Sequence, residues 1–143
     1  MKQRPVRGMR HLTIYIYFAQ MGGEGGPIKI GRSIDPHLRV SQLAVALPFP
    51  LQIVAVHRGY AGYVEGRTTE RHLHWEFRAS HLKGEWFAAT DEVMRYVRFA
   101  ATERGRAIIE REIAADAHKD WGHPEQRMPP SRHPATRKPR AAK

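Results

Sequence analysis

Two short runs of β-branched and aromatic residues flank a glycine-rich break near the N-terminus, and they restrict the fold of this chain more than any other feature. The runs cover residues 12–19 and 28–32. Runs of this composition and length are typical of strands, and a short glycine-containing connection returns one strand beside the other. We therefore expect a β-hairpin in which Tyr15 and Tyr17, two residues apart, point to the same face of the sheet.

The break between the two runs invites comparison with a phosphate-binding loop, and the spacing of its glycines excludes that alternative. Neither GxxxxGKS/T nor GxGxxG followed by a helix is present. The residues of the break are therefore expected to form a turn: Gly22, Gly23, Gly25, Gly26 and Pro27.

A helix is expected after the hairpin, and a third strand after that helix. Asp35 supplies a capping carboxylate, and Pro36 follows in the first turn, where its missing N–H costs nothing. This helix should run to about Ala46, because Pro48 stops it. Residues 51–57 are apolar at both odd and even positions, which predicts a strand that is buried on both faces.

The C-terminal half is expected to contain two helices separated by a short strand. The first helix lies within 64–79, the strand covers 85–88, and the last helix starts at 90–92 and continues to about Lys119 with a bend at Gly105. The first of these helices places four side chains on one stripe: Glu70, Leu73, His74 and Phe77. The order β-β-α-β-α-β-α predicts an α/β (α+β) sandwich with a short mixed or antiparallel sheet flanked by helices.

Positive charge is concentrated at the two ends of the chain. The formal net charge is +10 at pH 7, and most of it lies in 1–11 and 122–143. Five of the ten prolines also lie in 122–143. We therefore expect a basic N-terminal arm at 1–11, one domain at 12–121, and a disordered basic tail at 122–143.

Basic ends of this kind attract nucleic acid by releasing its counterions. Solubilising tails and binding to an anionic membrane surface are the alternatives that charge alone leaves open. We expect the partner to be DNA, with RNA as the second choice. The basic residues assigned to nucleic-acid binding are Arg32, Arg132, Arg137, Lys138 and Arg140.

Several classes of site and location are excluded by what the sequence lacks. It has no cysteine, which excludes disulfide frameworks, thiolate zinc sites, iron–sulfur clusters and cysteine nucleophiles. His72, His74 and His81 lack the HExxH spacing, so we expect no zinc site. No apolar run approaches the ~18 residues that span a bilayer, and the run at 12–19 is too short for an export signal. We expect a cytoplasmic protein with no membrane partner and no organic cofactor.

Five short motifs occur in a fixed order along residues 13–90. They read YIYF, KIGRS, an arginine eight residues after the KIG glycine, ExxLHxxF and GEWF. In this order and spacing the chain resembles the GIY-YIG nuclease superfamily, specifically its phage and bacterial branch, which has KIG in place of YIG and includes domains like that of open reading frame 172 of phage T5. The resemblance implies a small three-layer sandwich and a metal-dependent endonuclease that hydrolyses DNA.

The resemblance also assigns roles to residues of this chain. The tyrosine of the first motif corresponds to Tyr17, with Tyr15 as its neighbour on the same face, and the aromatic residue of the second motif corresponds to Lys29. The helix arginine corresponds to Arg39 and the metal-binding glutamate to Glu70. The motif residues that complete the second motif are Gly31 and Ser33.

This chain departs from the family pattern at two positions. Many members carry a histidine one turn after the helix arginine, where this chain has Leu43. Some members place an asparagine near the end of the domain, where this chain has GEWF. His74 is then the residue left to take over part of the proton transfer, or to orient a phosphate.

The same residues suit phosphodiester hydrolysis on chemical grounds alone. Tyr17 can act as general base if a nearby cation lowers its pKa, and the hairpin lays the strand of Lys29 beside it. Arg39 offers a fork of donors for a phosphate. Glu70 offers one hard oxygen ligand, which suits a single Mg²⁺, or Mn²⁺ in its place. If this interpretation is right, the four side chains converge in space.

Each of these residues also has a structural interpretation. The tyrosines suit sheet packing, the cations suit a solvated surface, and the glutamate and histidine suit the polar flank of a helix. Three functions are therefore considered: the endonuclease, a catalytically silent nucleic-acid-binding module of the same fold, and an interaction protein whose basic tails dock on an acidic partner.

Overall fold

The computed structural model describes residues 13–61 and 63–117 of the chain. Its centre is a five-stranded antiparallel sheet with the strand order β3-β1-β2-β5-β4. The strands are β1 Thr13–Met21, β2 Ile28–Ser33, β3 Leu51–Ala61, β4 His81–Lys83 and β5 Trp86–Phe87. The helices are α2 Pro36–Ala44, α3 Tyr63–Glu76, α4 Asp91–Ala101 and α5 Glu103–Ala117, with the 3-10 helix η1 at Arg78–Ser80.

The expected hairpin is confirmed. Strands β1 and β2 pair antiparallel, with Tyr17 opposite Gly31 and Ala19 opposite Lys29. The turn closes with a hydrogen bond of 3.0 Å from the backbone N–H of Met21 to the carbonyl of Pro27. Three of its glycines have positive φ, a conformation that costs a residue with a side chain far more. The glycine-rich break is therefore a turn, as predicted.

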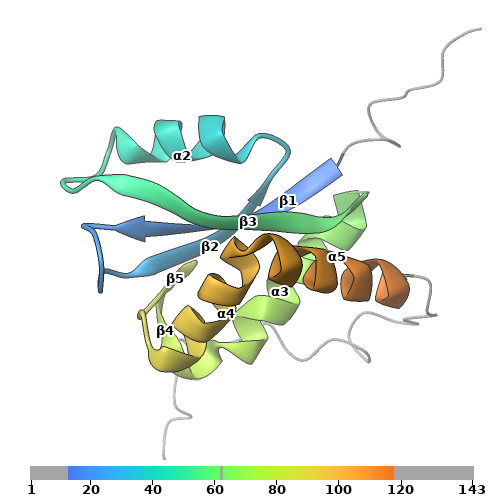
Figure 1. Cartoon of the computed structure of the whole chain (residues 1–143). Coiled ribbons are helices and arrows are strands. Elements are labelled where there is room, and N and C mark those ends of the chain that lie inside the picture. The colour runs from blue at the N-terminus through green and yellow to red at the C-terminus, as the bar shows by residue number, and fades with distance from the viewer. Residues whose placement is uncertain (1–12, 62, 118–143) are drawn as a thin grey trace, which may run out of the picture.

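The helices divide between the two faces of the sheet (Figure 1). Helix α2 covers one face, and α3, α4 and α5 cover the other. Successive side chains of β1 point to opposite faces of the sheet. Ile16 and Phe18 pack in the core under α3 to α5, whereas Tyr17 and Ala19 pack with Val40 of α2. Each fully buried aliphatic or aromatic side chain contributes roughly 1.5–3 kcal/mol. The predicted α+β sandwich with three layers is confirmed, and its sheet is antiparallel.

Local capping explains where two of the helices begin. The Asp35 carboxylate accepts a hydrogen bond of 3.2 Å from the backbone N–H of Leu38, and a proline follows it. The Thr90 side chain accepts from the backbone N–H of Val93 at 3.4 Å. Both starts were expected from the sequence, because the capping side chain and the first turn are adjacent in the chain.

The single C-terminal helix expected from residue 90 to about 119 is wrong. Thr102 has extended backbone (φ −88°, ψ 152°) and divides this stretch into α4 and α5. Its hydroxyl donates to the carbonyl of Phe99 at 2.8 Å and accepts from the backbone N–H of Gly105 at 2.9 Å. The chain therefore breaks at Thr102 rather than bending at Gly105. In α5, Ile109 is buried in the core under α3 to α5.

Strand β3 is longer than expected and is packed on both faces, as predicted. Ala55 belongs to the core under α3 to α5, and Val56 packs against the cluster beneath α2. The short elements η1 and β4 were not anticipated. No helix in the described ranges is long and apolar enough to cross a membrane.

Candidate active site

The site begins with the close approach of Tyr17 to Gly31 across the hairpin. The Tyr17 side chain is only 1% exposed. A Cβ atom added to Gly31 would lie 2.5 Å from the Tyr17 hydroxyl oxygen, which is far closer than van der Waals contact. The glycine of the KIG motif therefore makes room for the phenol to lie across β2.

Arg39 acts on the same phenol from the other element on this face. It lies in α2, where its side chain is exposed, and its positive charge acts to lower the pKa of the Tyr17 phenol. Helix α2 follows β2 after a tight turn in which the backbone N–H of Asp35 donates to Ser33 Oγ at 2.9 Å. Tyr17 and Arg39, both predicted site residues, thus lie on the same face of the sheet.

Lys29 lies on the same face of the hairpin, and a carboxylate from the turn between β4 and β5 binds it. Its Nζ atom is 2.8 Å from Glu85 Oε1 and 5.7 Å from the centre of the Trp86 ring. Only 12% of the Lys29 side chain is exposed. Pairing of β2 with β5, which sets Lys29 opposite Trp86, brings these residues together.

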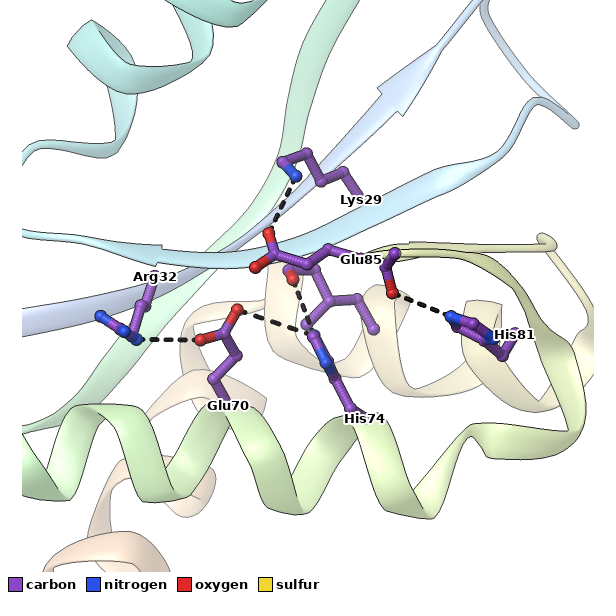
Figure 2. Close-up of polar contacts among 8 residues, drawn as sticks. Lys29, Arg32, Glu70, His74, His81 and Glu85 are labelled. Atoms are coloured by element: carbon purple, nitrogen blue, oxygen red, sulfur yellow. Dashed lines mark hydrogen bonds and ion pairs between the residues drawn. The ribbon is translucent and has the colours of Figure 1, made fainter. Parts of the chain in front are cut away.

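Glu85 connects Lys29 to Glu70 (Figure 2). Glu70 projects from α3 with 8% of its side chain exposed, and its Oε1 atom is 2.9 Å from Arg32 Nε. Glu85 lies between Lys29 and Glu70, with one oxygen on the lysine, and its negative charge acts on the carboxyl group of Glu70. Glu85 was not among the predicted site residues. The GEWF motif was the available signal, but the contact depends on strand pairing.

The two carboxyl groups hold their protons very differently. Burial and the negative charge of Glu85 raise the pKa of Glu70 to about 8. Burial acts in the same direction on Glu85, but the hydrogen bond and charge of Lys29 outweigh it and hold the pKa of Glu85 below its usual value. At neutral pH the pair therefore carries one proton, on the buried Glu70, while the more exposed Glu85 is ionised.

The expected effect of Lys29 on Tyr17 is wrong. Burial and the charge of Glu85 raise the pKa of Tyr17 to about 12, and the cation that opposes this rise is Arg39. The ammonium group of Lys29 is neutralised by Glu85 at 2.8 Å. The phenol therefore stays protonated at neutral pH in the free protein.

His74 lies one turn after Glu70 on the same stripe of α3, as predicted. Its Nε2 atom is 2.9 Å from the carbonyl oxygen of Ile30 and 3.7 Å from Glu70 Oε2. Because a carbonyl only accepts, Nε2 carries the hydrogen and donates it to β2. Burial lowers the pKa of His74. This hydrogen bond therefore links α3 to β2, and Nε2 has no second hydrogen to donate.

The remaining predicted residues lie around this cluster or outside the described ranges. Tyr15 is half-buried on the face of β1 that carries Tyr17, opposite Ser33. Arg32 is paired with Glu70. The basic residues of the tail that were assigned to nucleic acid lie outside the described residues: Arg132, Arg137, Lys138 and Arg140.

The donor set suits a hard divalent cation that keeps much of its water. Within the described ranges no group of three or more histidine, aspartate and glutamate side chains is arranged to hold a metal ion. Two carboxylates lie near each other, however, and the buried Glu70 Oε2 atom receives no hydrogen bond from a nitrogen or hydroxyl donor of these residues. Magnesium is held by one or two carboxylates plus water and substrate phosphate. The residues present fit such an ion.

A family model described as the T5orf172 domain matches residues 13–101, which is more than half of the chain. Neither the curated proteins nor the solved structures yielded a match. The matched region contains every strand and every site residue that the structure brings together here.

Proposed function

Since the chain belongs to the T5orf172 domain family, a nuclease-like and DNA-binding family, we propose that it is a metal-dependent endonuclease that hydrolyses DNA at a GIY-YIG-like site in the cytoplasm. One observation carries the proposal. The Tyr17 phenol lies across Gly31 of β2, and the charges of Arg39, Glu85 and Glu70 all act on its pKa. Residues 17, 39, 70 and 85 are far apart in sequence, and a structural role for each alone does not explain their meeting.

Arg39 binds the scissile phosphate in this proposal. Its guanidinium is exposed, carries a permanent positive charge, and offers parallel donors that match two phosphate oxygens. Its charge acts on the phenol of Tyr17, so a phosphate that it binds lies beside that phenol. Preorganised charge of this kind stabilises the transition state without reorganisation during the reaction.

Tyr17 first loses its phenol proton to solvent, and the phenolate then takes the proton of the attacking water. In the free protein its pKa of about 12 opposes this step, and after burial the largest cause is the charge of Glu85, with Glu70 adding to it. Neutralising the two carboxylates therefore lowers the pKa of the phenol, and Arg39 already acts in that direction. Tyr17 becomes an effective base only when positive charge bound at Glu70 and Glu85 compensates the negative charge of these two carboxylates.

Glu70 would hold the divalent ion, Mg²⁺ or Mn²⁺. When bound, such an ion stabilises the negative charge that develops on the leaving oxygen. Arg32 fixes one oxygen of Glu70 at 2.9 Å, so the other oxygen keeps a defined direction. The metal-dependent step therefore depends on a carboxylate that the fold holds rigid.

The test is cleavage of supercoiled plasmid by the purified protein with Mg²⁺, compared with EDTA. Tyr17→Phe keeps the packing of the ring and removes the hydroxyl, so we expect cleavage to fall by about 10² to 10⁴-fold, the usual contribution of a general base. Tyr96→Phe, which removes a hydroxyl bonded to His57 of β3 and to none of the proposed site residues, is the matched control and should keep its cleavage. Equal cleavage by Tyr17→Phe contradicts the proposal.

A catalytically silent DNA- or RNA-binding module is the second candidate, and the raised pKa of Tyr17 favours it. Such a module would shift labelled nucleic acid in a gel, weaken with salt, and leave the strands intact with every divalent ion. Comparison of DNA and RNA probes in the same gel identifies the partner.

A further inference from the structure

Glu85 lies in the turn between β4 and β5, and a backbone hydrogen bond fixes its position in the site. Its backbone carbonyl accepts a hydrogen bond of 3.0 Å from the N–H of Ile30, so the residue is held against the edge of β2. Its side chain turns inward, with one oxygen on Lys29 at 2.8 Å and the other directed at Glu70 (Figure 2). The direction of this carboxylate is therefore built into the sheet.

The carboxylates of Glu70 and Glu85 repel each other when both are ionised, unless a proton or a cation lies between them. Glu70 is 6% exposed, and its Oε2 atom accepts no hydrogen bond from a nitrogen or hydroxyl of the described residues. His74 Nε2 is 3.7 Å from this oxygen, which is too long for a hydrogen bond. A buried carboxylate oxygen without a donor carries a large desolvation penalty. A bound cation or a shared proton removes it.

We propose that Glu85 is a second protein ligand of the divalent cation, which it holds together with Glu70. This inference rests on the proposed function and adds a ligand to it. The cation is hard and oxygen-seeking, as Mg²⁺ and Mn²⁺ are, and water and a substrate phosphate supply the rest of its shell. The sheet edge and α3 thus each contribute one carboxylate.

The alternative role of Glu85 is to position Lys29 only. The two roles differ in what Lys29 does to metal affinity. If Glu85 binds the cation, removing the ammonium of Lys29 frees its carboxylate and leaves metal binding equal or stronger. If Glu85 serves only Lys29, its charge alone affects metal binding, so Glu85→Asp, which keeps that charge, should bind Mn²⁺ like the wild type.

The experiment is Mn²⁺ binding to the full chain without DNA, followed by electron paramagnetic resonance, with Mg²⁺ as competitor. We expect Glu70→Gln and Glu85→Gln each to weaken Mn²⁺ binding by more than about tenfold, since even outer partners of metal ligands are worth that much. Glu24→Gln removes the same charge from an exposed turn and should bind like the wild type. Lys29→Met should bind at least as tightly as the wild type.

The outcomes separate this inference from the proposed function. Wild-type affinity in Glu85→Gln, with loss in Glu70→Gln, overturns the role of Glu85 and leaves the nuclease proposal intact. Absence of Mn²⁺ binding by the wild type overturns both. If Glu85→Gln is unfolded by circular dichroism, Glu85→Asp replaces it. Withdrawal of the carboxylate by one methylene should weaken binding in a folded protein, and unchanged affinity contradicts the inference.

Discussion

Two buried polar clusters on the same sheet behave in opposite ways. His57 is fully buried in β3, donates from Nδ1 to the carbonyl of Arg58 at 2.8 Å, and accepts from the Tyr96 hydroxyl at Nε2 over 3.0 Å. Glu70 is nearly as buried, yet one of its oxygens has no such donor. The first cluster is complete without a ligand and supports the fold. The second is incomplete, which is the condition expected of a binding site.

The largest effect should come from Arg39→Ala in the incomplete cluster. We expect cleavage to fall by about 10² to 10³-fold, because a preorganised donor to the transition state is lost. Stability should not change, since the side chain is exposed. Arg95→Ala removes an exposed arginine from α4 and is the control. Single-turnover rates measure cleavage, and thermal unfolding measures stability. A large loss of stability would show that Arg39 supports the fold rather than the reaction.

His57→Ala should produce the reverse result. It removes a fully buried ring and leaves the Tyr96 hydroxyl without its acceptor. We expect a loss of about 3 kcal/mol in the free energy of unfolding, as for other large-to-small core substitutions. Urea denaturation measures this loss. The cleavage rate per folded molecule should stay within about twofold, and a larger decrease would show that the two clusters are coupled.

Gly31→Ala should reduce both stability and cleavage, because it disturbs the packing of the sheet and the position of Tyr17 together. The added Cβ would lie 2.5 Å from the Tyr17 hydroxyl oxygen, so the phenol must move. We expect a loss of about 1–3 kcal/mol in stability from overpacking, together with loss of cleavage. Gly23→Ala in the turn, where a Cβ meets nothing within 4 Å, tests backbone strain alone. Normal cleavage by Gly31→Ala contradicts the assigned position of the phenol.

The two clusters should also give opposite, smaller dependences of stability on pH. Burial lowers the pKa of His57 below 6.5, so its contribution is complete above that pH and is lost as the pH falls. Burial raises the pKa of Glu70 from 4.5 to about 8, so its contribution is complete at low pH and is lost as the pH rises through 8. Each slope is at most about 1.4 kcal/mol per pH unit.

Urea denaturation in EDTA across pH 4–9 measures these slopes. His57→Ala should flatten the acid side and Glu70→Gln the alkaline side. A variant that flattens the opposite side contradicts the assignment of the shifted group.

The fold was largely predictable because its signals are local. The turn glycines, the cap at Asp35 and the cap at Thr90 each act on residues within one turn of the chain. The break at Thr102 was not predicted, because a threonine inside a helical pattern is a weak signal until its hydroxyl accepts a hydrogen bond from the backbone N–H of Gly105 and begins a new helix. Short elements such as β4 depend on pairing and carry little pattern of their own.

The site was predictable in its members but not in its electrostatics. Motif spacing indicated Tyr17, Arg39 and Glu70, and in the structure the charges of Arg39 and Glu70 both act on the pKa of Tyr17. The role of Glu85 depends on a contact with Lys29 across 56 positions of the sequence, which only strand pairing creates. The sign of the pKa shift of Tyr17 follows from burial and from that carboxylate, so it could not be derived from the hairpin alone.

Single-turnover cleavage of end-labelled duplex DNA with Mg²⁺ tests the nuclease assignment most directly, using wild type and Glu70→Gln purified side by side. The account predicts cut strands with the wild type, none in EDTA, and a rate at least about 10²-fold lower in Glu70→Gln while DNA binding is retained. Equal cutting by the two proteins, or binding by the wild type without any cutting, would contradict it.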